Sequence, residues 1–333
     1  MKRKVTILGA GLVGSLLAVL LRKQGYEVDI YEHRPDMRKE NISAGKSINL
    51  AMSNRGWKAI EYAGLRSEIE AIAIPMTGRC LHQQDGQQQF QSYGKNGEAI
   101  YSVSRGVLNS KLMDLAEASG AKIHFNTRSI DVDVKQNILT LLNTDKSTST
   151  IQTDLLIGAD GAFSSLRKAY ATLDRVNFSQ YYINAGYKEL YMPPAVANTW
   201  AIEKNALHIW PRGKYMMIAL PNTDGSFTCT LFFPFEGNPS FQSVQTKSEI
   251  RDFFNEQFPD AVSLMPTLID DYLNNPVASL VTTKISPWYF ENKSFLIGDA
   301  AHAIVPFYGQ GMNAGFEDCS VLFELLQQYN HDW

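Results

Sequence analysis

Cysteine is scarce in this sequence, which contains only Cys80, Cys229 and Cys319 among its 333 residues. The three are odd in number and far apart, so they form neither a disulfide framework nor the spacing of a metal site, and they fit a reducing cytoplasm. A surplus of basic charge is also missing, because the net charge is −3. A general nucleic-acid-binding protein would carry such a surplus, and we therefore expect no nucleic-acid partner and no metal.

Long apolar runs are absent as well. One candidate, residues 5–21 behind the basic residues 2–4, could be mistaken for a signal peptide. It has no small-x-small cleavage site before a polar mature sequence, a strand-like segment follows almost at once, and it falls short of the ~20 residues of a membrane span. We therefore predict no membrane segment in this chain. A hydrophobic content of 44% and a charged content of 20% are typical of a globular protein, here long enough for two domains.

What the sequence does contain is a glycine fingerprint near its start. Residues 5–8 form an apolar run suited to a buried parallel strand, and Gly9, Gly11 and Gly14 follow in G-x-G-x-x-G spacing before a predicted helix over residues 12–23. Gly9 allows a sharp turn, Gly11 leaves room for a pyrophosphate, and Gly14 lets helix and strand pack closely. The helix N-terminus favours an anion through its free N–H groups and its dipole. We therefore predict a dinucleotide site that contains these glycines together with Leu12 and Val13.

A second predicted strand, residues 26–32, ends at the acid expected beyond such a fingerprint. Glu32 lies 18 positions after Gly14, close to the ~20 expected of the residue that binds a ribose hydroxyl. A carboxylate there would repel the 2′-phosphate of NADP, so the ligand of this half is NAD or FAD. Tyr31 and Arg34 are further candidates for contacts with the adenosine or a phosphate, and Ala51 could lie against the cofactor through its backbone.

A second glycine turn follows an apolar strand that starts at Asp154. The strand ends in Gly158-Ala159-Asp160-Gly161, and a predicted helix comes next. Asp160 could reach a ribose or a phosphate-bearing ligand, while Gly161 permits close approach. On this turn alone, a helix N-cap is the better explanation of Asp160.

A third turn lies close to the end of the sequence. Asp299 ends a predicted strand, Pro306 follows, and Gly309 and Gly311 free the backbone at the start of the last predicted helix. The N–H groups and dipole of that helix would stabilise a flat ring that becomes anionic on reduction, which is flavin rather than nicotinamide chemistry. The predicted flavin site also takes in the next two residues of this helix, Met312 and Asn313.

Between these motifs, residues 175–283 consist mainly of predicted strands. Aromatic and β-branched residues recur between Gly and Pro turns, which is typical of an antiparallel sheet, and residues 78–82 and 87–91 form a predicted hairpin. We predict an α/β fold, with a Rossmann-like FAD-binding domain built on a parallel sheet and a second, mainly antiparallel β-sheet substrate domain. The FAD-binding domain takes residues 1–72, 97–174 and 284–333, and the substrate domain takes residues 73–96 and 175–283.

The order of the three motifs resembles the FAD-dependent aromatic monooxygenases of the p-hydroxybenzoate hydroxylase type. Within that group, the kynurenine 3-monooxygenase family is similar over essentially the whole chain. A single dinucleotide fingerprint agrees with enzymes in which NADPH docks transiently without a Rossmann domain of its own. The strings that carry the likeness to this family are residues 46–53, 102–105, 208–212, 216–222 and 298–307.

The resemblance implies hydroxylation of L-kynurenine to 3-hydroxykynurenine by O₂ through a flavin C4a-hydroperoxide, with tightly bound FAD and with NADPH as transient reductant. It implies that Arg79 pairs with the substrate carboxylate, that Tyr93 lines the same pocket, and that Arg105 holds an FAD phosphate. On the residues alone, a surface strand residue and a core aromatic are better explanations of Arg79 and Tyr93, and an exposed helix-start charge would explain Arg105. We assign no acid–base role to any side chain, His302 included.

Two alternatives stay open at this point. One is a hydroxylase of the same fold that acts on another aromatic substrate, and the other is a non-catalytic FAD-binding or redox-sensing protein. The sequence ends at Trp333, soon after the last predicted helix, whereas members of the family continue into a helical C-terminal region. We expect that region to be absent from this chain, and we expect a cytoplasmic location.

Overall fold

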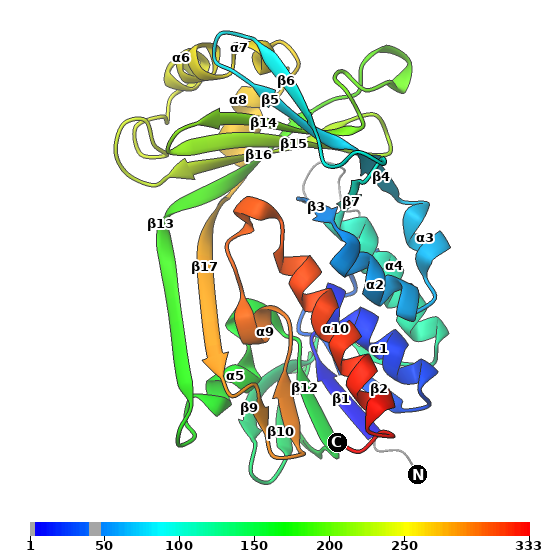
Figure 1. The fold of residues 1–333 in the computed structure, drawn as a ribbon. Helices are drawn as coiled ribbons and strands as arrows, with labels where there is room; N and C mark the ends of the chain where they lie inside the picture. Colours follow the sequence, from blue (N-terminus) through cyan, green and yellow to red (C-terminus); the bar gives the residue numbers. More distant parts are fainter. Residues whose placement is uncertain (1–3, 40–47) are drawn as a thin grey trace.

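The computed structural model describes residues 4–39 and 48–333 (Figure 1). A six-stranded sheet forms one half of the molecule, with the strand order β18-β19-β12-β1-β2-β8. All neighbours in it are parallel except the β18–β19 pair. The strands are β1 (Lys4–Leu8), β2 (Glu27–Tyr31), β8 (Lys122–His124), β12 (Leu155–Gly158), β18 (Tyr289–Phe290) and β19 (Ser294–Leu296).

Both faces of this sheet are covered, which explains why its central strands β1 and β12 are mostly apolar and almost wholly buried. Val5 and Ile7 of β1 pack into a core formed with the helices on one face, whereas Leu8 belongs to a second core on the other face. A three-stranded sheet and a short helix cover that other face. The helices of the first face are α1 (Leu12–Lys23), α2 (Asn54–Tyr62), α4 (Arg105–Ala118) and α10 (Gly311–Gln328), and the elements of the second face are β9 (Arg128–Asp133), β10 (Ile138–Leu142), β11 (Thr148–Gln152) and α5 (Ser165–Tyr170).

A seven-stranded sheet forms the other half, in the order β17-β13-β16-β15-β14-β5-β6. Its neighbours are antiparallel except for β14 and β5, which run parallel. Three helices cover one face of this sheet and enclose a separate aromatic core (Figure 1). The strands are β5 (Gly78–His82), β6 (Gln88–Ser92), β13 (Asn177–Met192), β14 (Ala206–Arg212), β15 (Tyr215–Pro221), β16 (Phe227–Pro234) and β17 (Val277–Ser286), and the helices are α6 (Lys247–Gln257), α7 (Pro259–Val262) and α8 (Leu268–Asn274).

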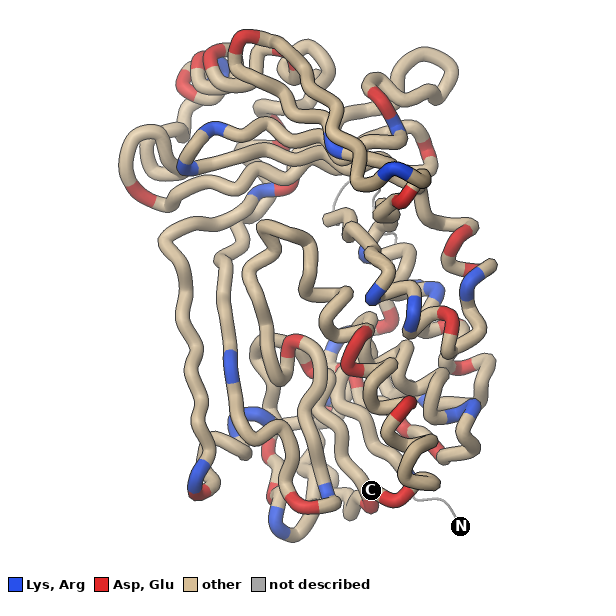
Figure 2. The backbone as a smooth tube through the Cα atoms, in the orientation of Figure 1, with Lys and Arg blue, Asp and Glu red and all other residues tan. Residues whose placement is uncertain are grey.

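A small sheet, β3-β7-β4, lies between the two halves. Lysine and arginine on the one hand and aspartate and glutamate on the other occur in both halves (Figure 2). No helix in the described part of the chain is both long and apolar enough to cross a bilayer. The remaining elements are β3 (Asn49–Met52), β4 (Ala73–Met76), β7 (Ile100–Ser104), α3 (Arg66–Glu70), α9 (Asp299–His302), η1 (Met37–Lys39), η2 (Gly161–Phe163), η3 (Val196–Asn198) and η4 (Pro306–Tyr308).

The structure confirms the predicted fold class, and it confirms the predicted first helix and the hairpin of β5 and β6. α7 begins at Pro259, where the missing N–H costs nothing because the first N–H groups of a helix have no partner within it. β4 pairs with β7 rather than with the seven-stranded sheet. The boundaries of the two domains stay a prediction. Predictions that fall on residues 1–3 and 40–47 lie outside the described residues.

Candidate active site

The three fingerprint glycines have different surroundings in the turn after β1. Gly9 has φ +94°, and a Cβ added to it would lie 2.7 Å from the carbonyl oxygen of Ala159. A Cβ on Gly14 would lie 2.1 Å from the carbonyl oxygen of Gly9. A Cβ on Gly11 would meet no atom of a described residue outside its own turn within 4 Å. Packing of the protein itself therefore requires Gly9 and Gly14, whereas Gly11 faces open space at the start of α1.

Glu32 reaches this turn from the end of β2. Its carboxylate accepts a hydrogen bond from the Ala10 N–H at 2.9 Å and is only 2% exposed. Arg34 donates to the same carboxylate from its backbone N–H and its Nε, both at 2.9 Å. Burial raises the pKa of Glu32, but the hydrogen bonds from Arg34 and Ala10 outweigh burial and the net pKa is lowered. The fingerprint turn therefore contains an ionised carboxylate, and Arg34 contacts this carboxylate directly.

Asp160 lies against the same turn from the end of β12. Its Cα would be 2.9 Å from a Cβ on Gly9, so the first and second motifs touch. Its Oδ2 accepts from the N–H of Ser165 at 2.7 Å, whereas its Oδ1 is buried without a partner among the described residues. A cavity of about 610 Å³ beside it is lined by Gly9, Tyr31 and Asp160. Asp160 is therefore both a support for α5 and a source of one unpaired acceptor.

The third motif packs against the first. Gly298 has φ +60°, and a Cβ on it would lie 3.1 Å from the Val13 side chain. A Cβ on Gly315 of α10 would lie 2.5 Å from the same side chain. Neither α1 nor α10 has a side-chain hydrogen bond at its N-cap. The starts of these two helices, from opposite ends of the sequence, are thus close together and uncapped by side chains, as the predicted shared ligand requires.

Asp299 and Arg105 are two of the ionisable residues near the third motif, where Asp318 also accepts from the Gly298 N–H at 2.7 Å. Asp299 begins α9, and a Cβ on Gly311 would lie 3.8 Å from its Oδ1. The surrounding protein raises the pKa of Asp299, with the positive charge of Arg105 opposing that rise. The side chains of both residues are nevertheless exposed to solvent, so each is open to a ligand. Arg105 is the first residue of α4, and its N–H donates to the Ile48 carbonyl at 3.2 Å.

Asn313 makes hydrogen bonds to the protein backbone that the sequence did not predict. Its side chain is fully buried: Oδ1 accepts from the Ser53 N–H at 2.9 Å, and Nδ2 donates to the carbonyls of Ala51 at 2.9 Å and Gly309 at 3.2 Å. These bonds use all of its amide hydrogens, so a cofactor contact from this side chain stays a prediction. Its neighbour Met312 is also buried.

Arg167 was missed by sequence reasoning and connects two of the motifs. It is 2% exposed, and its guanidinium donates to the carbonyl of Ala162 after the second motif and to the carbonyl of Ala300 in the third, the latter at 2.9 Å. Burial lowers the pKa of Arg167, while the charges of Asp160 and Asp299 oppose that shift. A basic residue six positions after a Gly-x-Asp-Gly turn was the available signal.

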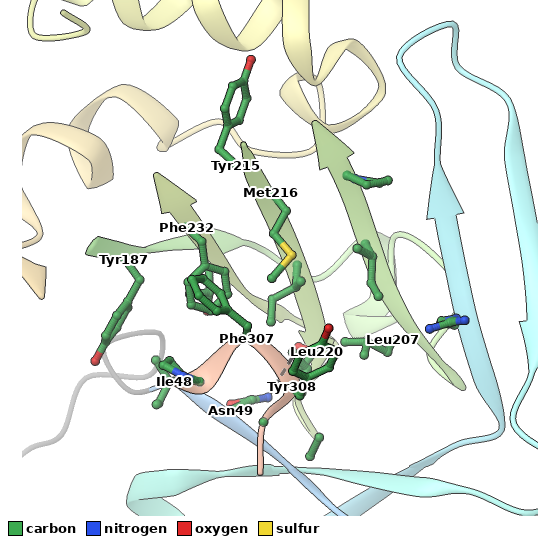
Figure 3. A pocket seen from close by; sticks show the side chains of 18 of the residues that line it. Ile48, Asn49, Tyr187, Leu207, Tyr215, Met216, Leu220, Phe232, Phe307 and Tyr308 are labelled. Atoms are coloured by element: carbon green, nitrogen blue, oxygen red, sulfur yellow. Dashed lines mark hydrogen bonds between the residues drawn. The ribbon is translucent and has the colours of Figure 1, made fainter. Parts of the chain in front are cut away.

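A cavity of about 870 Å³ lies between the seven-stranded sheet, β3 and η4 (Figure 3). Arg79, Tyr93, Ala51, Pro306 and Gly309 all line it, so the structure brings these predicted residues together. Sequence reasoning missed most of the remaining lining, which comes from alternate positions of several strands and from η4. These residues include Ile48, Tyr187, Leu207, Ile209, Met216, Leu220, Phe232, Phe307 and Tyr308.

Most of this lining is apolar, with Arg79 as a cation that a ligand can reach. The rings of Phe232 and Phe307 meet edge to face, with their centroids 5.2 Å apart. Arg79 is exposed, and among the described residues only Gln91 accepts from its guanidinium, at 2.8 Å. Burial raises the pKa of Tyr93 while Arg79 opposes the rise, so Tyr93 stays a neutral hydroxyl near that cation. The arrangement suits an aromatic ligand with a carboxylate.

The chain as a whole resembles known flavoproteins. The family described as an FAD binding domain matches residues 2–331. A solved 2-methyl-3-hydroxypyridine-5-carboxylic acid oxygenase has a TM-score of 0.78 at 21% identity over 98% of this chain and 83% of its own. A probable FAD-dependent monooxygenase from Pseudomonas aeruginosa has a TM-score of 0.75 at 18% identity over 100% and 88%. These structures share the fold. The family match, together with the paired glycine turns, places the chain among the proteins with an FAD binding domain.

Relatives in sequence narrow this class. Kynurenine 3-monooxygenases from Flavobacterium psychrophilum and Dictyostelium discoideum are 50% and 49% identical, over 99% and 98% of this chain and 74% and 70% of their own length. The Sus scrofa enzyme of that name is 42% identical over 100% of this chain and 70% of its own length. The chain belongs to the kynurenine 3-monooxygenase family. Two residues of its first family string, Lys46 and Ser47, lie outside the described residues.

Proposed function

We propose that this chain hydroxylates L-kynurenine to 3-hydroxykynurenine, with NADPH as the electron donor and O₂ as the oxygen source. The names of its relatives, at 42–50% identity along nearly the whole chain, support this proposal. The structural observation that carries it is one shared cavity. Arg79 and Tyr93, proposed for the substrate, line the same space as Pro306 and Gly309, proposed for the flavin.

The residues at the glycine turns suit FAD. The open space at Gly11 and the uncapped start of α1 would accept a pyrophosphate, and the buried Glu32 would accept from a ribose hydroxyl. The orphan Oδ1 of Asp160 and the exposed carboxylate of Asp299 are acceptors for further hydroxyls. Bound FAD supplies the redox chemistry with NADPH and O₂. The other residues proposed to contact it are Leu12, Val13, Tyr31, Arg34, Ala51, Arg105, Gly309, Gly311, Met312 and Asn313.

The chain's own residues would bind and orient the substrate. A planar guanidinium grips a carboxylate through two parallel hydrogen bonds, and the terminal nitrogens of Arg79 are available for this purpose. The apolar lining around Phe232 and Phe307 would hold the aromatic ring and exclude water. No acid–base side chain is needed in this proposal, because the amino group of kynurenine activates its own ring.

The test is a coupled turnover measurement on the purified chain with FAD. We expect L-kynurenine to accelerate NADPH oxidation and O₂ uptake, and we expect 3-hydroxykynurenine to appear in chromatography. A panel of other aromatic acids tests the substrate class. Hydroxylation of another compound but not of L-kynurenine would refute the substrate, and NADPH consumption without any hydroxylated product would refute the hydroxylase.

We also propose a cytoplasmic location. All three cysteines are free and buried, which is the state expected in a reducing compartment. Fractionation of cells that produce the native protein would test this proposal, and recovery with a secreted or periplasmic fraction would contradict it.

A further inference from the structure

The face of the seven-stranded sheet that lies away from the cavity contains two buried histidines. Successive residues of a strand point to opposite faces, so Arg79 and Leu207 line the cavity while His82 and His208 lie behind them. Both rings are 1% exposed. The described function of the cavity uses neither of them.

The two rings belong to a continuous chain of hydrogen bonds. Oδ2 of Asp260, at the start of α7, lies 2.6 Å from Nδ1 of His82. Nε2 of His82 lies 2.9 Å from Nδ1 of His208, and Nε2 of His208 lies 2.8 Å from the Glu203 carbonyl oxygen. Trp210 donates to Oδ1 of Asp260 at 2.9 Å and stacks on the His82 ring at 4.0 Å. The chain therefore joins α7 to β5 and β14.

Counting protons fixes the state of this chain. A carbonyl only accepts, so Nε2 of His208 is protonated, and a buried imidazole without a carboxylate partner is neutral, which leaves its Nδ1 as an acceptor. Nε2 of His82 must then donate to that Nδ1. The remaining proton lies between Nδ1 of His82 and Asp260. Three bonds hold three protons with no net charge, and removal of one proton leaves two facing acceptors and a buried negative charge.

This chain of hydrogen bonds supports β5, the strand that carries Arg79. β5 lies next to the edge strand β6, and its only other neighbour is β14, paired over Ala206–Ile209. Arg212 adds a second tie, because its Nη1 donates to the His82 carbonyl at 2.9 Å and its Nε to the Gln257 carbonyl at 2.6 Å. Loss of the His82–His208 bond would leave β5 attached mainly by its backbone.

We propose that the Asp260–His82–His208 hydrogen-bond chain positions Arg79, so that affinity for the substrate depends on its bonds being intact. This inference rests on the proposed function of Arg79. The other ionisable groups around the chain are Cys80 on β5, Glu203 before β14, Arg212 on β14 and Tyr215 on β15. Of these, Arg212 favours the ionised form of Asp260, and Glu203 and Cys80 add no positive charge.

Two substitutions of one residue separate positioning from mere support. In Asp260→Asn, the amide oxygen can accept from Trp210 while the amide N–H donates to His82, so all bonds persist without a carboxylate. In Asp260→Ala, the bond to His82 is lost. Asp270→Asn, on the exposed face of α8, is the matched control.

The dissociation constant of L-kynurenine is measured from flavin absorbance. We expect Asp270→Asn and Asp260→Asn to bind with wild-type affinity, because both keep every bond of the hydrogen-bond chain. Asp260→Ala should bind about tenfold more weakly while its FAD affinity stays unchanged, since a misplacement of about 1 Å can cost up to about a hundredfold in rate. Wild-type affinity in Asp260→Ala, or weakened affinity in Asp260→Asn, overturns the proposal.

A measurement independent of substrate distinguishes failure of this inference from failure of the proposed function. Nitrogen-15 NMR of labelled histidines should show His208 protonated at Nε2 only and His82 protonated at Nε2. An unprotonated Nε2 on His82 overturns the chain even if L-kynurenine proves not to bind. Stoichiometric zinc in the purified protein would overturn it too, since Sγ of Cys80 and one ring nitrogen each of His82 and His208 lie within 4.8 Å of one another and could bind an ion.

Discussion

Gly11→Ala and Gly14→Ala form a matched pair that tests whether the fingerprint turn holds a ligand. Both substitutions add one methyl group within the same turn. At Gly14 this group would lie 2.1 Å from the carbonyl oxygen of Gly9, whereas at Gly11 nothing within 4 Å is contributed by residues 4–39 and 48–333 outside the turn itself. Gly11 is the N-cap of α1 with φ −72° and ψ −176°, a conformation open to alanine. The two variants should therefore fail in different ways.

The magnitudes follow from these contacts. Gly14→Ala must move backbone in a packed turn, and overpacking of this kind costs about 1–3 kcal/mol of unfolding free energy. Gly11→Ala should change the stability of the FAD-free protein by less than about 1 kcal/mol, because only an N-cap preference is altered. With FAD present, the Gly11 methyl competes with the pyrophosphate for space. We expect FAD affinity to fall at least about tenfold, which is about 1.4 kcal/mol.

The assay combines urea unfolding of the FAD-free proteins with titration of FAD by flavin fluorescence. The expected result is a near wild-type unfolding midpoint with weak FAD binding for Gly11→Ala, and a lowered midpoint for Gly14→Ala. Wild-type FAD affinity in Gly11→Ala would refute the reasoning, because the open space at the start of α1 would then not be occupied by the cofactor.

Three further predictions concern single side chains. Arg79→Ala should raise the KM for L-kynurenine about tenfold or more and leave FAD bound, because a charged hydrogen bond contributes about 1.5–3 kcal/mol; an unchanged KM would remove Arg79 from the site. Asn313→Ala should lower the unfolding free energy by about 2–4 kcal/mol, since three buried backbone groups lose their partner, and a urea midpoint equal to wild type would contradict this. Burial lowers the pKa of His302, but Asp318, which accepts from it at 2.7 Å, outweighs burial and the net pKa is raised. The stability difference between wild type and Asp318→Asn should therefore be full below pH ~6.5 and shrink as pH rises through the raised value, and a difference that grows with pH would be inconsistent with this pairing.

The glycine turns and the elements around them could be predicted because their signals are local. A strand, a glycine spacing and a helix follow each other within about twenty residues, and the acid at Glu32 comes at a fixed distance. The structure shows a local reason at Gly14, where a side chain would meet the Gly9 carbonyl, whereas the obstacle at Gly9 is the distant backbone of Ala159. Recurring aromatic and β-branched residues between Gly and Pro turns over residues 175–283 predicted the antiparallel sheet from local signals as well.

Contacts between distant parts of the chain had no such signal. Arg167 donates to a carbonyl 133 positions away, and Asn313 donates to one 262 positions away. In the sequence, Arg167 looks like any basic residue of a helix, and Asn313 looks like any residue at the glycine-rich start of a helix. Arg79 could be placed near a substrate only through family resemblance, because one arginine on a short strand is compatible with any surface.

The position of the active-site cavity depends on a junction that no periodic pattern indicates. In the described part of the chain, the six-stranded and seven-stranded sheets share no strand pairing, so side chains help to set their separation. Asn49 of β3 donates to the Pro221 carbonyl at 3.1 Å and to the Asn222 side chain at 2.8 Å, and the buried Ser102 donates to the same Pro221 carbonyl at 2.8 Å. These bonds fix the small sheet against the end of β15, and the cavity lies between those two elements. A buried polar group without a partner destabilises the folded protein. The junction is therefore most stable in the geometry that pairs these groups. The width of the cavity, and hence the reach of Arg79 toward the flavin side, therefore depends on a few polar residues that sequence periodicity treats as loop.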